Sequence, residues 1–210
     1  MKIFRFVGLA LMLCSVGLLM AQEVSQTAYG VKLNVPGGNL RCEVQFYTPS
    51  IVRIVKYPQA EMPDEKSLAV VLAPEETKFK VDETGDVVTL ESTDIIVTLD
   101  KQDGTVKFAD KEGVLLLAEQ GMPSFKPCEN EVDKGYYRVR QAFRLDKDEA
   151  IYGIGQHQTG KMNQRNLRKY LIQSNLEDSS PFFQSVKGYG LYWDCLLYTS
   201  PSPRDISGYR

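Results

Sequence analysis

Histidine is almost absent from this chain of 210 residues, so several kinds of active site lack their parts. His157, the one histidine, is the single candidate base for a serine-type triad, and no G-x-S-x-G motif accompanies it. One histidine and a few scattered cysteines do not supply the ligand spacing of a zinc site. The sequence therefore predicts no metal site and no bound cofactor.

Cysteine is also too sparse for a disulfide framework. Cys14 lies in an apolar run that we expect to be removed, which leaves Cys42, Cys128 and Cys195, an odd and widely spaced set. An excess of charge of one sign is missing too, because 25 Lys and Arg residues oppose 27 Asp and Glu residues, a net charge of −2. This balance gives no electrostatic reason to bind nucleic acid or an anionic membrane surface, so we expect a neutral partner.

A long uninterrupted hydrophobic run is likewise lacking. The apolar stretch at residues 6–20 is too short and too rich in glycine for a membrane span. Because Lys2 and Arg5 precede this stretch and Ala21 follows it, residues 1–21 are predicted to be a signal peptide. We expect an exported protein, periplasmic or secreted, with no membrane segment once the peptide is removed. An uncleaved membrane anchor is the alternative.

Helical periodicity is scarce in residues 29–145, which are predicted to be almost all strand and turn, with apolar and polar residues alternating at 31–35 and 40–46. A hairpin is predicted from the segments 31–35 and 40–46, which flank a Pro-Gly-Gly-Asn turn. A polar surface loop is predicted at 59–66. Further strands are predicted at 51–57, 87–91, 95–99, 105–108, 114–118 and 136–145. Short strands at regular spacing are typical of an all-β fold, and we predict an antiparallel β-sandwich.

The stretch from Glu149 to Asp194 contains two aromatic, glycine-bearing segments joined by a polar loop. The first segment, 151–155, alternates large residues with glycine, as a strand does when backbone or ligand comes close to one face. The second, 181–194, is predicted to be a hairpin that turns at Lys187 and Gly188. Amides and cations fill the loop between them, and such groups suit a ligand that carries hydroxyl groups.

Four motifs occur in order in this stretch: E-x-x-Y-G-x-G-Q, N-x-R-N, I-Q-x-N and P-F-F-x-S-x-K-G-Y-G-L-x-W-D. Together they resemble the end of the N-terminal, galactose-mutarotase-like β-sandwich domain of glycoside hydrolase family 31, the α-glucosidases and α-xylosidases. The sequence Gln156-His157-Gln158 is most similar to the α-xylosidase branch. The resemblance implies a β-sandwich over residues 22–194, and substrate contacts at Gln156, His157, Asn163 and Arg165.

The resemblance also implies a retaining α-glycosidase whose two catalytic aspartates lie on a (β/α)8 barrel after the sandwich. Neither the barrel nor those aspartates are expected in this sequence, so no catalytic residue is predicted and the chain alone should be inert. The substrate of the whole enzyme would be an oligosaccharide, most simply a xylose-decorated one, with an α-glucosidase as the near alternative. A stand-alone carbohydrate-binding sandwich and a ligand-free structural sandwich are further alternatives.

Several residues also have simpler explanations. His157 is more simply a loop histidine that hydrogen-bonds a neighbour than a catalytic one. The carboxylates of Asp146, Asp148, Glu177 and Asp178 could serve as the acid and base of glycoside cleavage, but their polar turn sequence favours solvated surface charge. Sugar stacking is possible for several aromatic residues, although their alternation favours a place in the core: Phe182, Phe183, Tyr189, Tyr192 and Trp193.

Residues 195–210 depart from the family pattern. Where the family continues after W-D with a polar turn, this chain has Cys195 followed by a Ser- and Pro-rich run. This run is similar to translated sequencing adaptor, and we predict a non-native tail. A native linker to another domain is the alternative.

Overall fold

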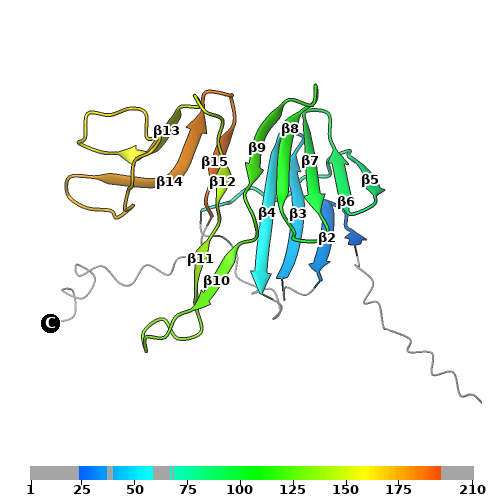
Figure 1. The fold of residues 1–210 in the computed structure, drawn as a ribbon, viewed down its shortest axis with the longest axis horizontal. Coiled ribbons are helices and arrows are strands. Elements are labelled where there is room, and N and C mark those ends of the chain that lie inside the picture. The colour runs from blue at the N-terminus through cyan, green and yellow to red at the C-terminus, as the bar shows by residue number, and fades with distance from the viewer. Residues whose placement is uncertain (1–23, 37–39, 59–66, 68, 195–210) are drawn as a thin grey trace, which may run out of the picture.

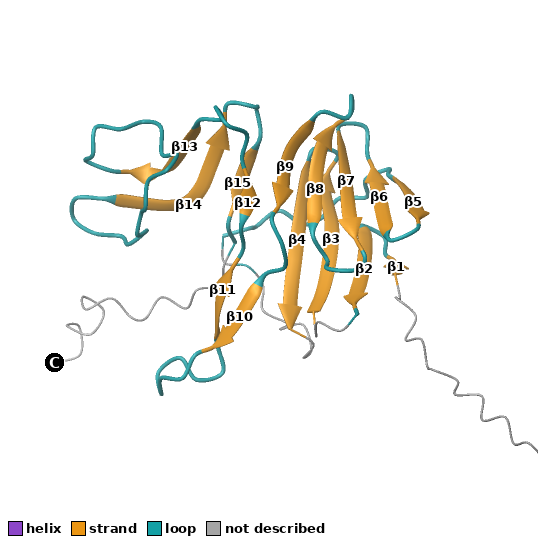
Figure 2. Cartoon of the chain, viewed as in Figure 1, coloured by secondary structure: helices purple, strands orange, loops and turns teal. Residues whose placement is uncertain are grey.

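The computed structural model describes residues 24–36, 40–58, 67 and 69–194, and within these ranges every regular element is a β-strand (Figure 2). No helix among the described residues is long and apolar enough to cross a membrane. The strands are β1 (Val24–Gln26), β2 (Gly30–Val35), β3 (Leu40–Thr48), β4 (Ile51–Pro58), β5 (Lys80–Thr84), β6 (Val87–Glu91), β7 (Ile95–Asp100), β8 (Val106–Asp110), β9 (Leu115–Glu119), β10 (Ser124–Pro127), β11 (Tyr137–Arg140), β12 (Phe143–Arg144), β13 (Ile151–Gln156), β14 (Asp178–Ser185) and β15 (Gly190–Tyr192).

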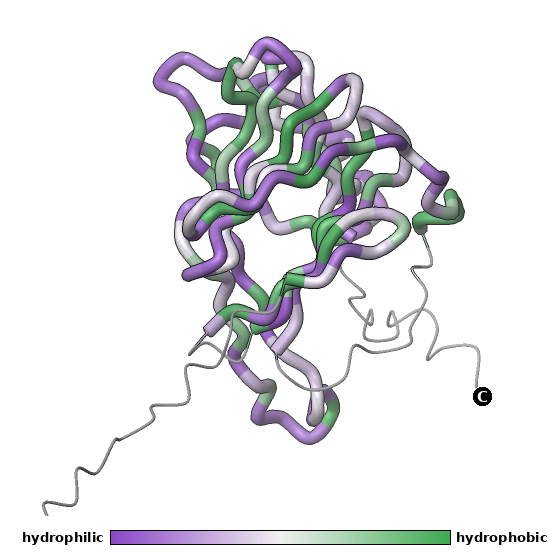
Figure 3. Tube along the Cα trace, turned by 90° about the vertical axis from the view of Figure 1, so that its right-hand side faces the viewer, coloured by the Kyte–Doolittle hydropathy of each residue, from purple (hydrophilic) through white to green (hydrophobic). Residues whose placement is uncertain are grey.

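Two antiparallel sheets pack face to face and form the sandwich (Figure 1). One has the order β1-β2-β3-β4, and the other has the order β12-β9-β8-β7-β6-β5. Alternate residues of facing strands bury apolar side chains between the sheets, such as Leu33 and Val44 from the first and Leu90 and Val97 from the second. Hydrophobic segments therefore run along neighbouring strands (Figure 3). The predicted all-β sandwich is confirmed.

Two smaller sheets lie outside this core. The hairpin of β10 and β11 projects away from the sandwich, and β13, β14 and β15 form a three-stranded sheet beyond β9 and β12 (Figure 1). Little of the three-stranded sheet is buried, with Ile151 and Ser185 as the exceptions. Polar contacts rather than a shared apolar core therefore have a large part in holding it to the sandwich, as described below.

Most predicted strands appear at the predicted places. The hairpin of β2 and β3 pairs Val35 with Leu40, and the predicted strands at 51–57, 87–91 and 95–99 are β4, β6 and β7. The predicted strands at 105–108 and 114–118 are β8 and β9, shifted by a residue or two. The predicted signal peptide, the loop at 59–66 and the tail at 195–210 lie outside the described residues and stay predictions.

The single strand predicted at 136–145 is wrong. This segment forms two strands in different sheets, since β11 pairs with β10 whereas β12 pairs with β9. The break falls at Gln141, whose side-chain amide donates hydrogen bonds to the carbonyl oxygens of Gly121 and Ala142. These bonds lie at the break between the two strands, and an alternating pattern does not reveal such a break.

The glycines of β13 leave room for a neighbouring strand, as the sequence predicted. Gly153 and Gly155 both have positive φ, 104° and 98°, on either side of a register shift in the pairing with β14. A Cβ atom on Gly155 would lie 2.0 Å from the carbonyl oxygen of Asp178, and one on Gly153 would lie 2.8 Å from that of Phe182. The group that comes close is therefore the backbone of β14.

Replacing Gly155 with alanine is expected to lower the free energy of unfolding by about 2–3 kcal/mol, because positive φ and a backbone clash add together. Gly188 provides a matched control. It has a φ of 85°, but a Cβ there would meet nothing within 4 Å, so Gly188→Ala should cost only about 1 kcal/mol. Urea denaturation of both variants measures the difference, and equal losses would contradict the clash.

Candidate functional site

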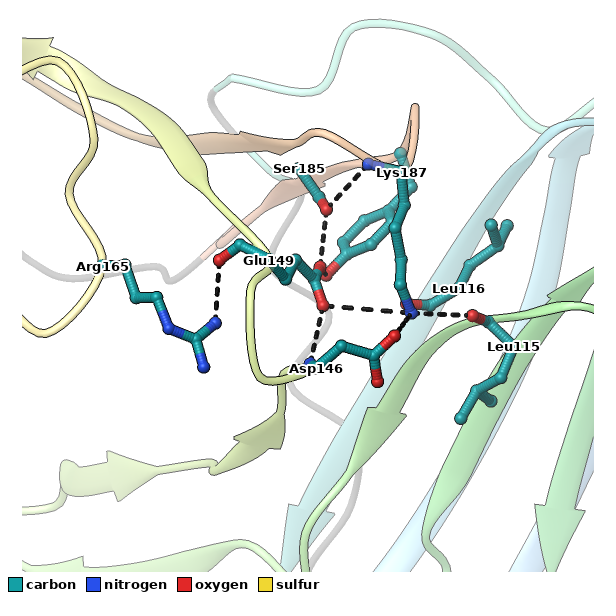
Figure 4. Close-up of polar contacts among 8 residues, drawn as sticks. Leu115, Leu116, Asp146, Glu149, Arg165, Ser185 and Lys187 are labelled. Atoms are coloured by element: carbon teal, nitrogen blue, oxygen red, sulfur yellow. Dashed lines mark hydrogen bonds and ion pairs between the residues drawn. The ribbon is translucent and has the colours of Figure 1, made fainter.

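The carboxylate of Glu149 is the centre of a buried polar cluster between the sandwich and the three-stranded sheet (Figure 4). Its Oε1 accepts hydrogen bonds from Ser185 Oγ and Tyr189 Oη, both at 2.5 Å. Its Oε2 accepts a hydrogen bond of 2.9 Å from the backbone N–H of Asp146. The residue is 3% exposed, so these bonds form where water competes little.

Lys187 extends this cluster to the sandwich. Its Nζ lies 2.7 Å from Asp146 Oδ2 and 3.9 Å from Glu149 Oε2. The same Nζ donates to the carbonyl oxygens of Leu115, at 2.9 Å, and Leu116, at 3.5 Å, both in β9 (Figure 4). One lysine therefore connects the β14–β15 turn to an inner strand of the larger sheet.

The environment shifts the ionisation of two members of the cluster. Burial acts to raise the pKa of Glu149, but hydrogen bonds from Ser185, Tyr189 and the Asp146 N–H, with the charge of Lys187, outweigh it and lower that pKa. Burial raises the pKa of Tyr189, and its hydrogen bond to Glu149 raises it further. Glu149 is therefore held as the anion and Tyr189 as the neutral donor.

A second anchor lies at the end of β15. Asp194 Oδ2 lies 3.2 Å from a guanidinium nitrogen of Arg53 in β4, and Asp194 Oδ1 accepts a hydrogen bond of 2.8 Å from Ser67 Oγ. Next to it, the rings of Trp193 and Phe143 form a T-shaped pair, with ring centroids 6.5 Å apart. Both ends of the β14–β15 hairpin are thus attached to the sandwich.

The four residues predicted to bind substrate lie at the end of β13 and in the loop after it. Gln156 is exposed, and its backbone pairs with Asp178 at the end of β13. The imidazole of His157 is buried, and its Nε2 lies 2.9 Å from the carbonyl oxygen of Ile154, which agrees with the simpler explanation given for this residue. Substrate binding by either residue stays a prediction.

Asn163 and Arg165 make contacts that shape the loop. Asn163 Oδ1 accepts hydrogen bonds from the backbone N–H groups of Ile151, at 3.2 Å, and Arg165, at 3.0 Å. The Arg165 guanidinium donates a hydrogen bond of 2.8 Å to the carbonyl oxygen of Glu149 (Figure 4). Both side chains therefore fold the loop back onto the start of β13, and their predicted contact with substrate stays a prediction.

The expectation that the aromatic residues near the C-terminus are core residues is wrong. Phe182 and Tyr192 are exposed, at 37% and 42%, and Phe183, Tyr189 and Trp193 are only half-buried. The cause is the position of their sheet, which lies beside the sandwich core and not within it.

The Glu149 cluster was not predicted from the sequence. Ser185, Lys187 and Tyr189 are polar residues at every second position of an otherwise apolar and glycine-rich segment. The chain turns at residues 186–188, between β14 and β15, so this spacing does not by itself place the three side chains on one face. The turn brings Ser185 and Tyr189 to the same carboxylate oxygen of Glu149.

A family model for the glycosyl hydrolase 31 N-terminal galactose mutarotase-like domain matches residues 41–200. An α-xylosidase of Saccharolobus solfataricus is 29% identical over 167 residues, which cover 75% of this chain and 22% of that protein. The crystal structure of a family 31 α-xylosidase from Xanthomonas citri is 36% identical with a TM-score of 0.76, over 80% of this chain and 18% of that one.

A second solved relative is a family 31 α-xylosidase from a soil metagenome, complexed with xylose. It is 25% identical with a TM-score of 0.70, over 82% of this chain and 28% of that one. The chain thus spans less than a third of the length of each of these relatives. Since the family model matches most of the sequence, this chain belongs to glycoside hydrolase family 31, and its sandwich is that family's N-terminal galactose mutarotase-like domain.

Proposed function

We propose that the chain is the barrel-supporting domain of an exported α-glycosidase, an α-xylosidase that acts on xylose-decorated oligosaccharides. The observation that carries this proposal is the likeness to α-xylosidases that are several times longer than the matched region. In this proposal the catalytic aspartates belong to the barrel, and the sandwich positions the loop between β13 and β14 beside it.

Exposed apolar side chains after Glu149 support the proposal that a large partner domain covers this surface. Many large apolar side chains of this region are open to solvent, from 37% for Phe182 to 80% for Met162. They lie in the β13–β14 loop and in the strands that follow it, and comprise Met162, Tyr170, Leu171, Ile172, Leu176, Phe182 and Tyr192. Exposed apolar residues in such number are typical of a surface that is covered in the working protein.

Two assays test the proposal. The purified full chain should hydrolyse neither an aryl α-xyloside nor an aryl α-glucoside above a matched blank. When residues 24–194 replace the corresponding region of the Xanthomonas citri α-xylosidase, the chimera should keep measurable α-xylosidase activity. Hydrolysis by the chain alone, or a folded but inactive chimera, would overturn the proposal.

A stand-alone carbohydrate-binding domain is the second candidate, and one observation favours it. Tyr192 pairs directly with Phe182, and Tyr152 pairs with Gln184, two residues along the same strand, so the three aromatic rings share one face of the sheet. Each of these residues is at least 36% exposed. Calorimetry with xylose-decorated oligosaccharides distinguishes the two candidates. A stand-alone carbohydrate-binding domain requires that the isolated chain binds the oligosaccharide and that Phe182→Ala abolishes this binding.

A further inference from the structure

The loop between β13 and β14, residues 157–177, is closed by a contact between its first and last residues. His157 follows β13 directly, and Glu177 directly precedes β14. His157 Nδ1 lies 3.6 Å from Glu177 Oε1. The contact spans the base of the loop that contains Asn163 and Arg165, two of the residues predicted to meet substrate.

The contact at the other ring nitrogen, Nε2, determines the tautomer of the neutral imidazole. The side chain of His157 is 1% exposed, and its Nε2 lies 2.9 Å from the carbonyl oxygen of Ile154. Because a carbonyl oxygen only accepts, Nε2 carries the hydrogen in the neutral ring and Nδ1 is then an acceptor. Nδ1 is buried without a hydrogen-bond partner. A buried acceptor that faces a carboxylate oxygen, itself an acceptor when ionised, is unfavourable.

A proton on Nδ1 makes the contact with the Glu177 carboxylate favourable. Both ring nitrogens of the imidazolium are donors, so Nδ1–H points a positive charge at the Glu177 carboxylate and forms a charge-assisted contact. Among the described residues, Glu177 is the one carboxylate that pairs with the ring, and the contact from β13 is the uncharged Ile154 carbonyl. The next carboxylate along the chain, Asp178, lies opposite Gln156 in the sheet.

The ring also holds a strained part of β13. Ile154 has a φ of 58°, which is rare for a β-branched residue, and it lies at the register shift between Gly153 and Gly155. The bond from His157 Nε2 satisfies the carbonyl group of this residue. The loop contact and the irregular strand are therefore linked through one imidazole.

We propose that His157 and Glu177 form a proton-operated clasp that fastens the loop at mildly acidic pH and loosens it at alkaline pH. Histidine is the side chain whose charge changes between about pH 5 and 8. Protonation adds the clasp contact and deprotonation removes it, so the loop is more ordered when the imidazole is charged. The importance of the clasp for substrate rests on the proposed function, but its existence does not.

Amide hydrogen exchange of the full chain, measured by NMR or mass spectrometry and corrected for intrinsic rates, tests the clasp. The reporters are the amides of Gln164, which donates to the Ile151 carbonyl, and Ser174, which donates to the Glu177 carbonyl. Their protection should be about threefold higher at pH 5.5 than at pH 8.0, the factor expected for a partly exposed ion pair. The chain has one histidine, so a single imidazole signal reports protonation in the same samples.

Two variants and one control make the result specific. Glu177→Gln removes the charge, and His157→Gln keeps a donor for the Ile154 carbonyl without titrating, so both should abolish the pH dependence. The control Glu129→Gln alters an exposed carboxylate in another loop and should leave it unchanged. Equal protection at both pH values in the unaltered chain, or a pH dependence that persists in Glu177→Gln, would overturn the clasp. Neither outcome bears on the proposed hydrolytic function.

Discussion

Replacing Lys56 with methionine is expected to lower the free energy of unfolding by about 3–5 kcal/mol. Lys56 in β4 forms an ion pair with Glu119 in β9, which joins the two sheets of the sandwich, and the two side chains are only 8% and 6% exposed. Glu119 Oε2 also accepts a hydrogen bond of 2.7 Å from the Val106 N–H. Without the lysine, a buried carboxylate lacks its counter-charge, and this accounts for the size of the loss.

The double variant Lys56→Met, Glu119→Gln separates this cause from a general loss of packing. Glutamine keeps an oxygen for the Val106 N–H but carries no charge, so most of the stability should return. The control Lys111→Met breaks an exposed pair with Glu112, in which both side chains are 63% exposed, and should cost less than about 1 kcal/mol. Urea denaturation at pH 7 measures all three, and a double variant no better than the single one would refute the explanation.

Acidic pH should reduce the loss in free energy of unfolding that Lys56→Met causes. Burial raises the pKa of Glu119 above the ordinary value of 4.5, and Lys56 opposes this, so removal of the lysine raises that pKa further. A carboxyl group whose pKa is raised by folding favours the folded state below its unfolded pKa. That contribution is lost as the pH rises through the folded pKa. The loss caused by Lys56→Met should therefore be smaller at pH 5 than at pH 7.5.

Replacing Glu149 with alanine is expected to destabilise the three-stranded sheet by about 3–5 kcal/mol. The change leaves Ser185, Tyr189 and the Asp146 N–H without their acceptor and removes a carboxylate beside Lys187. Because few apolar contacts compensate, the loss should be local. Amide hydrogen exchange should show reduced protection in β13 and β14 while β6 and β7 keep theirs.

The pH dependence of this local stability has a definite sign. Folding lowers the pKa of Glu149, so its contribution is present above the ordinary value of 4.5 and is lost as the pH falls through the folded pKa. Glu149→Gln should therefore lose less stability than the unaltered chain between pH 6 and pH 3.5. The neighbouring control Asp148→Asn, at an exposed carboxylate, should follow the unaltered chain. Identical pH profiles for all three proteins would show that the carboxylate has no such role.

Strands of the sandwich could be predicted where one face meets the core. Apolar and polar side chains alternate at residues 88–91 and 97–99, and the structure buries Val88, Leu90, Val97 and Leu99 as that pattern requires. The antiparallel pairing of β2 and β3 was predicted because the sequence Pro-Gly-Gly-Asn, typical of a turn, separates two alternating segments. Such an alternating pattern arises where one face of a sheet is buried and the other is exposed.

Strands with little burial did not follow this rule. β5 consists mainly of charged and polar residues and was not predicted. β11 alternates apolar and cationic residues, although it is exposed along its whole length. Phe182 and Tyr192 alternate in the way core residues do, but their sheet lies beside the core. Alternation shows which residues share a face, and it does not show whether that face is covered.

The candidate site was predicted only in part for a related reason. The polar loop was evident from its composition, and the glycines of β13 indicated a close approach of another segment. The side-chain hydrogen-bond partners of Glu149, Ser185 and Tyr189, lie 36 and 40 residues along the chain and come together only through the pairing of β13, β14 and β15. Local sequence patterns carry no information on contacts of that separation.

The position of the core has a consequence for the order in which the protein is made. All buried residues of the core cluster lie between Val31 and Val106, so the ribosome has synthesised them before it begins on β13. Chains fold in the order of synthesis where early segments form a unit of their own. The sandwich can therefore fold first. The later sheet then attaches to the folded sandwich through the contacts of Glu149 and Asp194. A chaperone that recognises nascent apolar segments would meet the exposed residues after Glu149 last, when the sandwich is already folded.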